Sequence, residues 1–152
     1  MALPTHLTLQ IVTPDRLVVR EEVDEVEVPG ANGYFGVLPG HTPMLAALTV
    51  GELWYRKGSE RTYVAIAYGF AEVLPDGVTI LAQLAERADQ IDVTRAEAAL
   101  KRAQERLAGP HEQVDYERAR TALQKALSRL EVSSRGGVSP RSAVLNQVRP
   151  QG

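Results

Sequence analysis

The sequence predicts an α+β protein, with an N-terminal antiparallel β-sandwich of about ten strands followed by a C-terminal antiparallel hairpin of two helices. Residues 6–83 consist of short β-branched or alternating runs separated by turn signals. From about residue 85 onward, apolar residues instead recur every three or four positions. We therefore place a sandwich domain at residues 1–88, a helical hairpin at 89–132 and a disordered tail at 133–152.

The strand region is defined by alternation and by turn residues. Valines and glutamates alternate over residues 25–28, the period-two pattern of a half-exposed strand. The sequence "LPDGV" predicts a tight hairpin turn at Asp76-Gly77, since glycine readily adopts a positive φ. Residues 44–48, which also fit one helical turn, are interpreted as a strand. Because no helical pattern interrupts these runs, an antiparallel sandwich or barrel is expected.

The helical region consists of two amphipathic segments. Strong helix formers fill residues 92–108, where Asp92 is placed to cap the first helix, and Gly109-Pro110 ends it before a second helix at 111–132. Alanine-rich stripes allow the helices to approach closely, and so small an interface predicts docked and extended states of similar energy. The stripes contain Ala96, Ala99, Leu100, Ala103 and Leu107 in the first helix, and Tyr116, Ala119, Leu123, Ala126, Leu127 and Leu130 in the second.

Composition argues against several classes of function. The chain has no cysteine, and its three histidines, His6, His41 and His111, are widely separated, which argues against thiolate chemistry and metal binding. No run approaches the roughly 18 apolar residues of a membrane span, and no signal segment opens the chain. A cytosolic or peripheral protein without direct membrane insertion is therefore expected.

The net charge of −2 conceals an asymmetry between the two regions. Residues 1–92 carry six Lys and Arg against thirteen Asp and Glu, whereas residues 93–152 carry eleven against six. This division indicates two regions with different partners. The basic region contains a single aromatic residue, Tyr116, which argues against nucleic-acid binding.

The stretch "GYFGVLPGHTPML" at residues 33–45 is rich in apolar residues. A phosphate-binding loop would place a helix N-terminus directly after its glycines, often with a lysine, but here Pro39 and Pro43 follow. A turn between strands is the simplest interpretation, yet six apolar side chains exceed what a solvated turn requires. These are Tyr34, Phe35, Val37, Leu38, Met44 and Leu45.

Four motifs in order, "TPDRLV", "GxxGVLPGHTPML", "YVAIAYGFAEV" and "IDVTRAEAALKRA", resemble the epsilon subunit of F-type ATP synthases, called delta in mitochondria. The resemblance covers residues 4–132. It implies a non-catalytic rotor-stalk subunit that binds the gamma subunit and the c-ring, couples proton flow to ATP synthesis and restrains ATP hydrolysis. It also implies a peripheral location on the cytoplasmic face of a bacterial plasma membrane, or on the stromal face of the thylakoid.

By this resemblance, the 33–45 stretch contacts gamma and the ring. Its interface residues are then Tyr34, Phe35, Leu38, His41 and Met44, with His41 acting as a contact and not as a base. Some family members have an acidic residue facing basic ring loops at the position of Tyr34. Asn32 or the acidic run Glu21, Glu22, Asp24 and Glu25 is the candidate substitute, and a solvated acidic face is the alternative.

The basic hairpin suggests two roles. In an extended state, the hairpin would present seven cations to acidic regions of the alpha and beta subunits: Lys101, Arg102, Arg106, Arg118, Arg120, Lys125 and Arg129. The alternative is that these cations lie on a solvated pair of helices. Docked, the hairpin places Arg95, Ala99 and Arg102 on one face, with Arg95 level with Lys125 and Ile91 level with Arg129. Four cations around a triphosphate predict ATP as a regulatory ligand, and no other cofactor is expected.

The resemblance assigns more of this site. An "I/L-D-x-x-R-A" motif of ATP-binding members is matched by Ile91, Asp92, Arg95 and Ala96, with Glu86 upstream. Ile91 would then pack on adenine, and Glu86 and Asp92 would orient the base and the helix start. The basic residues Arg95, Arg102, Lys125 and Arg129 would hold phosphates. Lys125 departs from the arginine expected in the tightest binders. The alternative is that Asp92 only caps its helix.

Two other classes of protein compete with this interpretation. An enzyme with a sandwich fold would gather histidines or carboxylates in a cleft, but the histidines here are separated and the carboxylates mostly alternate outward. A free-standing sandwich that binds carbohydrate or peptide, with a helical oligomerisation tail, is the remaining alternative.

Overall fold

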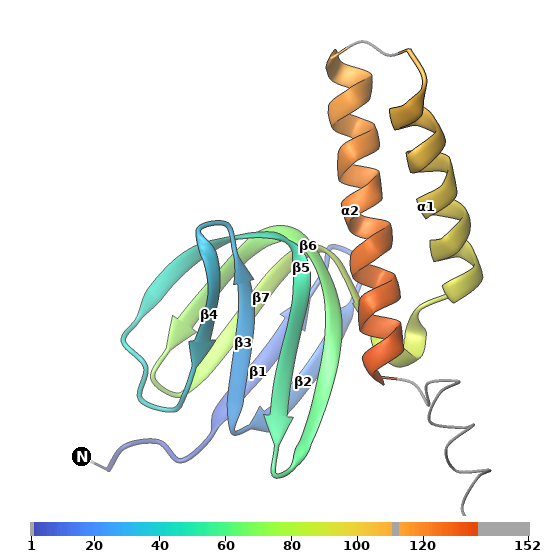
Figure 1. Cartoon of the computed structure of the whole chain (residues 1–152). Helices are drawn as coiled ribbons and strands as arrows, with labels where there is room; N and C mark the ends of the chain where they lie inside the picture. The colour runs from blue at the N-terminus through green and yellow to red at the C-terminus, as the bar shows by residue number, and fades with distance from the viewer. Residues whose placement is uncertain (1, 111–112, 137–152) are drawn as a thin grey trace, which may run out of the picture.

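The computed structural model describes residues 2–110 and 113–136 and confirms the predicted fold class (Figure 1). One seven-stranded sheet, in the order β2-β1-β7-β6-β5-β3-β4, curls into a sandwich and is followed by two helices. The strands are β1 (Leu7–Val12), β2 (Leu17–Val23), β3 (Glu25–Gly30), β4 (Gly33–Val37), β5 (Met44–Lys57), β6 (Glu60–Leu74) and β7 (Gly77–Arg87). The helices are the 3-10 turn η1 (Ala88–Gln90), α1 (Val93–Ala108) and α2 (Gln113–Gly136).

The strand count is lower than the ten predicted because three strands are long. Both ladders of β6 skip a residue where Tyr68 has φ 57° and Gly69 has φ 133°. Gly69 is required there, because a Cβ would collide with the backbone of Leu81. The register is the same on both sides of this gap, which interrupts β5, β6 and β7 at one level, and dividing the three strands there brings the count to ten. β2 also contacts β5 across the core, although the two are not neighbours in the sheet.

One strand pair departs from the antiparallel prediction. β1 pairs with β2 in antiparallel fashion but with β7 in parallel, with Leu9 opposite Val78 and Ile11 opposite Ile80. A short turn fixes the direction of a hairpin partner, whereas strands at opposite ends of the domain meet without such a constraint. The sequence pattern of alternating residues does not reveal strand direction, so this pairing was not predicted.

The sandwich core follows the predicted alternation. Val26 and Val28 are fully buried, and Glu25 and Glu27, which alternate with them, are partly exposed. The predicted hairpin at Asp76-Gly77 joins β6 to β7, with Leu74 opposite Gly77. The largest fully buried side chains come from all seven strands, so the core spans both layers: Leu7, Leu9, Ile11, Val23, Val26, Val28, Val37, Leu53, Val64, Ile66, Val73 and Ile80.

The helical hairpin forms as predicted at its start. The Asp92 carboxylate accepts a hydrogen bond from the Arg95 backbone N–H at 3.1 Å, so Asp92 caps α1. α1 and α2 pack through small side chains, with Ala96 and Ala103 facing Ala119 and Ala126 at 2% exposure or less.

Two stripe residues and the start of the tail differ from prediction. Tyr116 and Leu127 are exposed, because α2 lies between α1 and the sandwich and turns a second face, including Ser128 and Val132, toward the strands (Figure 1). α2 continues to Gly136, past the predicted start of the tail at residue 133. The rest of the predicted tail, residues 137–152, lies outside the described part of the chain.

Candidate functional site

Polar side chains of α2 attach the hairpin to the sandwich. Arg129 donates to one carboxylate oxygen of Glu86 through Nη2 at 2.7 Å and Nε at 3.0 Å. The Ser128 hydroxyl donates to the Gly51 carbonyl at 3.0 Å and is buried. A small apolar cluster of Ala65, Ile91 and Val132 lies beside them. Docking therefore combines a few hydrogen bonds with little apolar surface.

The end of α2 is held by Arg135 and two serines. Arg135 Nη1 lies 2.9 Å from Glu52 Oε1, and the guanidinium lies 5.5 Å from the centre of the Tyr63 ring. The hydroxyls of Ser133 and Ser134 donate to carbonyls one turn earlier, which extends the helical hydrogen bonding beyond the predicted end. Burial raises the pKa of Glu52, which has only 15% of its side chain exposed.

A cleft of about 440 Å³ lies between the hairpin, the end of β7 and the turn between β1 and β2. It brings together six of the eight residues predicted to bind ATP: Glu86, Asp92, Arg95, Ala96, Arg102 and Arg129. Ala99, which shares their helix face, also lines it. Within the described part of the chain, Arg95 and Arg102 form no ion pair, so their guanidinium groups remain available to an anion.

The other two predicted residues lie outside this cleft. Ile91 is 9% exposed and packs with Ala65 and Val132. The Lys125 ammonium lies 5.7 Å from the centre of the Tyr68 ring, over the sandwich. Counting residues along a helix predicts how far along the axis a side chain lies, but not which surface that side chain contacts.

The cleft also contains residues that the sequence did not indicate. Thr13, Asp15 and Arg16 come from the turn between β1 and β2, and Arg16 donates to the Gln90 side chain at 3.3 Å. About 75 residues separate this turn from α1, and only the parallel pairing of β1 with β7 brings them together. This turn belongs to the "TPDRLV" motif, but nothing in that motif indicates that the turn lies beside α1.

The 33–45 stretch presents most of its predicted interface residues to solvent. Tyr34, Leu38 and Met44 are 53%, 55% and 37% exposed. Phe35 is half-buried against the core, and His41 Nδ1 lies 2.6 Å from the Thr42 carbonyl, which fixes its ring. The structure thus offers three apolar side chains of this stretch for contact, with Phe35 and His41 supporting them.

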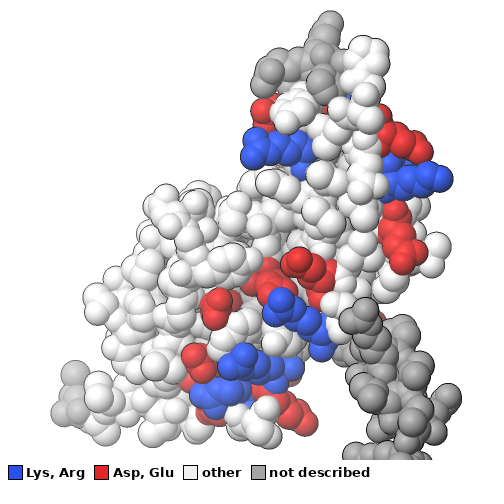
Figure 2. Space-filling model, viewed as in Figure 1, with Lys and Arg blue, Asp and Glu red and all other residues white. Residues whose placement is uncertain are grey.

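Four exposed leucine and phenylalanine residues extend this surface over β5, β6 and β7. We call them the apolar face: Leu45, Phe70, Leu74 and Leu81. Phe70 lies opposite Leu81 in the ladder of β6 and β7, and Leu45 belongs to the 33–45 stretch itself. Figure 2 shows that charged side chains gather on the helices and near the turn between β5 and β6, whereas the opposite end of the sandwich is largely uncharged.

Sequence alternation did not identify Phe70, because the buried face of β6 switches at the irregular backbone of Tyr68 and Gly69. Val64 and Ile66 point into the core before Tyr68, and Ala71 and Val73 point into it afterwards. Uninterrupted alternation would have buried Phe70 with Ile66. The glycine at position 69 was the available signal for a bend in this strand.

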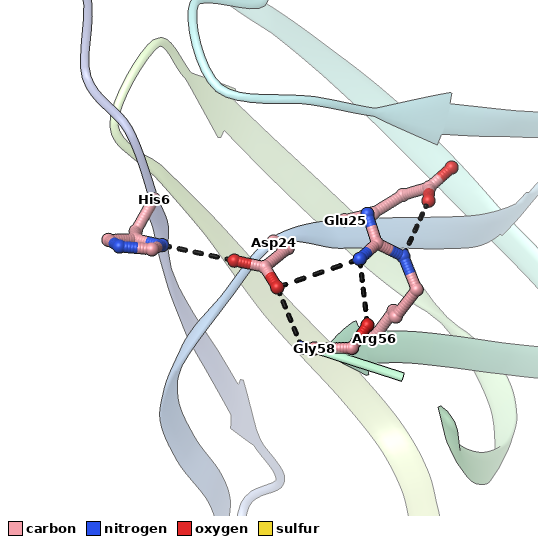
Figure 3. A network of polar contacts seen from close by, with 5 residues as sticks. All are labelled: His6, Asp24, Glu25, Arg56 and Gly58. Atoms are coloured by element: carbon pink, nitrogen blue, oxygen red, sulfur yellow. Dashed lines mark hydrogen bonds and ion pairs between the residues drawn. The ribbon is translucent and has the colours of Figure 1, made fainter. Parts of the chain in front are cut away.

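Part of the predicted acidic run is engaged within the chain (Figure 3). Asp24 contacts His6 at 3.1 Å and accepts from the Gly58 N–H at 2.8 Å, and the Gly58 hydrogen bond holds the Asp24 pKa below its usual range. Arg56 donates to Glu25 at 3.2 Å. This network ties the turn between β2 and β3 to the turn between β5 and β6, so these two acids serve the sandwich itself.

The described residues offer neither a metal site nor a membrane-spanning helix. The described residues contain no group of three or more histidine or acidic side chains that could hold a metal ion. Neither helix, as far as it is described, combines the length and apolar character needed to cross a bilayer.

Comparison with known families adds an independent finding. The model of the ATP synthase delta/epsilon chain beta-sandwich domain matches residues 6–88, and that of the long alpha-helix domain matches residues 89–134. The ATP synthase epsilon chain of Syntrophobacter fumaroxidans is 58% identical over 102 residues, covering 67% of this chain and 76% of the relative. That of Koribacter versatilis is 54% identical over 103 residues, covering 66% and 72%.

Solved structures resemble the whole described fold. A chain in the Euglena gracilis mitochondrial ATP synthase structure of OSCP, F1 and c-ring has a TM-score of 0.75 at 25% identity, covering 86% of this chain and 82% of that chain. A chain in the Tetrahymena thermophila mitochondrial ATP synthase central stalk and c-ring has a TM-score of 0.59, covering 87% and 99%. At 12% identity the second likeness concerns the fold alone.

Proposed function

The chain belongs to the ATP synthase delta/epsilon chain family, and on that basis we propose that it is a central-stalk rotor subunit bound to the gamma subunit and the c-ring. Family membership makes it a non-catalytic subunit of ATP synthase, as the sequence predicted. Its rotor role is to couple proton flow to ATP synthesis. The structure similar to it from Euglena gracilis is an assembly that includes F1 and the c-ring.

The apolar face is the observation that carries this proposal. Phe70, Leu81 and Leu45 are 61%, 56% and 74% exposed on neighbouring strands of a well-packed sheet. Large apolar side chains grouped on a soluble surface indicate a protein interface. A rigid sheet is suited to a permanent contact, because little conformational freedom is lost when the partner binds.

A charge placed on this face tests the contact. Phe70→Asp in the full chain should abolish a one-to-one complex with gamma, because association would bury an unpaired carboxylate. Leu127→Asp is the matched control, since Leu127 is 44% exposed on α2 and lies away from the sheet. Retention of the complex by a folded Phe70→Asp chain would refute this use of the face.

The hairpin is proposed to restrain ATP hydrolysis. Five of its seven predicted cations are exposed while it is docked, namely Lys101, Arg102, Arg106, Arg118 and Arg120. Release of the few contacts of α2 would allow the hairpin to extend and present these cations to acidic regions of the alpha and beta subunits. Truncation after residue 88 should raise the rate of ATP hydrolysis by the assembled enzyme. An unchanged rate would show that the hairpin does not restrain hydrolysis.

The cleft is proposed to bind ATP while the hairpin is docked. Its volume lies within the range of small-molecule sites, and Arg95 and Arg102 offer forked donors to phosphate oxygens. A ligand held between α1 and the sandwich would favour the docked state, because it binds that state alone. ATP would thus act as a regulatory ligand.

The proposed location follows from the proposed partners. A chain held by gamma and the c-ring would be peripheral on the cytoplasmic face of a bacterial plasma membrane, or on the stromal face of the thylakoid. Fractionation should therefore find it with the membranes in cells that assemble the complex, and free of them in cells that lack gamma.

A further inference from the structure

One peptide group, between Gly51 and Glu52, is held by side chains from two distant elements. The Ser128 hydroxyl of α2 donates to the Gly51 carbonyl at 3.0 Å, and the Glu52 N–H donates to the Tyr34 hydroxyl of β4 at 3.2 Å. A trans peptide is a rigid plane whose C=O and N–H point in opposite directions. Tyr34 and Ser128 therefore hold the two sides of the same plane.

On its β3 side this peptide depends on a side chain, because the ladder between β3 and β5 is interrupted there. The register passes from Glu27 opposite Trp54 to Gly30 opposite Leu48, so two residues of β3 lie opposite five of β5. One of these two is Pro29, which has no N–H to donate. The Glu52 N–H, left without a partner in β3, therefore donates to Tyr34, whereas on the other side Gly51 stays paired with Ile66 of β6 and its carbonyl also accepts from Ser128.

Tyr34 lies directly against the backbone of Gly51. A Cβ at position 51 would collide with the Tyr34 hydroxyl and would lie 2.8 Å from the Pro29 Cβ. Only glycine therefore allows the tyrosine to reach the peptide. A displacement of the Tyr34 ring must move or release this peptide, because no intervening side chain absorbs the change.

The two sides of this peptide face different surroundings. Tyr34 is 53% exposed and lies in the 33–45 stretch. On the hairpin side, the Glu52 carboxylate pairs with Arg135 at 2.9 Å, so Glu52 and Gly51 together receive the last two turns of α2. A short segment of β5 thus joins an accessible aromatic ring to the docking contacts of the hairpin.

We propose that Tyr34 is a positioning residue for the hairpin: its hydroxyl fixes the Gly51–Glu52 peptide in the orientation that Ser128 and Arg135 require. Hydrogen bonds to the two ends of an amide strengthen one another, so loss of one weakens the other. A protein partner that holds Tyr34 in place favours docking, and one that pulls the ring away favours release. The partner's part in this rests on the proposed stalk contact, whereas the coupling within the chain does not.

Hydrogen exchange of the full chain tests the coupling. Tyr34→Phe removes one oxygen that touches no atom of α2, yet it should speed exchange of the amides of residues 124–136 about 2- to 10-fold, the effect of losing one hydrogen bond. Ser128→Ala should act similarly. The double variant should exchange more slowly than the product of the two single effects predicts, because both act through one peptide.

A conservative change at a second tyrosine serves as the control. Tyr63→Phe keeps the ring that Arg135 covers and should leave α2 exchange unchanged. The inference is overturned if Tyr34→Phe leaves α2 exchange at the wild-type rate, if the two single effects multiply independently, or if β1 and β2 accelerate equally, which would indicate general destabilisation of the sandwich. Capture of gamma does not enter this measurement, so the coupling and the proposed stalk contact fail separately.

Discussion

The sandwich and the hairpin are held together by different interactions. In the sandwich, large aliphatic side chains such as Leu9, Leu53 and Ile80 have no exposed surface. Between α1 and α2, the fully buried side chains are alanines, including Ala103 and Ala126. Burial of a leucine contributes about 1.5–3 kcal/mol, whereas a single methyl group contributes about 0.8 kcal/mol. The sandwich is therefore a rigid platform, and the hairpin is a weakly packed arm.

The attachment of the hairpin to the sandwich differs again from both. Ion pairs of Arg129 with Glu86 and of Arg135 with Glu52 are combined with one buried serine hydrogen bond. Partly buried pairs contribute modest net energy, since desolvation offsets their attraction. Polar contacts also find water as a partner after release, so a polar docking surface allows the arm to leave without exposing a large apolar area.

The largest effect is expected from a cavity in the sandwich. Leu53→Ala should lower the free energy of unfolding by about 2–5 kcal/mol, because the side chain is fully buried and its neighbours cannot collapse completely. Leu45→Ala, at an exposed position, should change it by about 0.5 kcal/mol or less. Urea titration followed by circular dichroism measures both. Similar losses for the two variants would contradict a rigid, closely packed platform.

A smaller and more local effect is expected at the docking surface. Arg129→Met leaves the Glu86 carboxylate partly buried without its partner and should weaken docking by about 1–3 kcal/mol. Thermolysin should then cleave α2 faster while the sandwich remains resistant. Arg118→Met, at an exposed position of the same helix, is the matched control. Equal protection of α2 in the wild type and in Arg129→Met would show that the ion pair does not hold the arm.

The residues predicted to bind ATP differ in whether they line the cleft between the arm and the platform. Arg95→Ala should weaken ATP binding about 10-fold, the loss of a charge-assisted hydrogen bond, because its guanidinium lines the cleft. Lys125→Ala should have little effect, since its ammonium lies over Tyr68 and outside the cleft. Calorimetry of the full chain with ATP separates the two. A larger loss of ATP affinity for Lys125→Ala than for Arg95→Ala would show that the phosphates lie near Lys125, as helical spacing predicted.

Local features of the fold were predictable from sequence because their causes are local. The Asp92 cap, the turn at Asp76-Gly77 and the burial of Val26 and Val28 each depend on residues within a few positions of one another. The helix stripes were correct where α1 meets α2, at Ala103 and its neighbours. These features express backbone preferences that no distant contact overrides.

The remaining features depend on distant contacts. The buried face of β6 switches at Tyr68 and Gly69, which have positive φ, so simple alternation fails for Phe70. Arg16 enters the cleft through a parallel strand pair that no sequence pattern specifies. Arg135 lies in a segment whose composition predicts disorder, but Glu52 provides a partner that extends the helix. Each case requires the packed molecule and not the isolated segment.

The smallest expected effect is a difference between the two regions in how their contribution to stability depends on pH. Burial raises the pKa of Glu52 above its usual value of 4.5, with Arg135 opposing this and Glu131 and Glu27 reinforcing it. The folded state therefore binds more protons at this group, and its contribution to stability is lost as pH rises through the raised pKa. The unfolding free energy of Glu52→Gln relative to wild type should then increase as pH rises above 4.5.

Asp24 in the sandwich should behave in the opposite way. Its pKa is lowered below 3.8, mainly by the Gly58 N–H and also by His6, so its contribution is present above 3.8 and is lost as pH falls through the lowered pKa. Asp24→Asn should therefore flatten the acid limb of the stability curve and leave the neutral limb unchanged, whereas Glu52→Gln alters the limb above pH 4.5. Urea titrations across this range measure both slopes. Equal slopes for Glu52→Gln and wild type above pH 4.5 would show that docking of α2 does not bury the Glu52 charge.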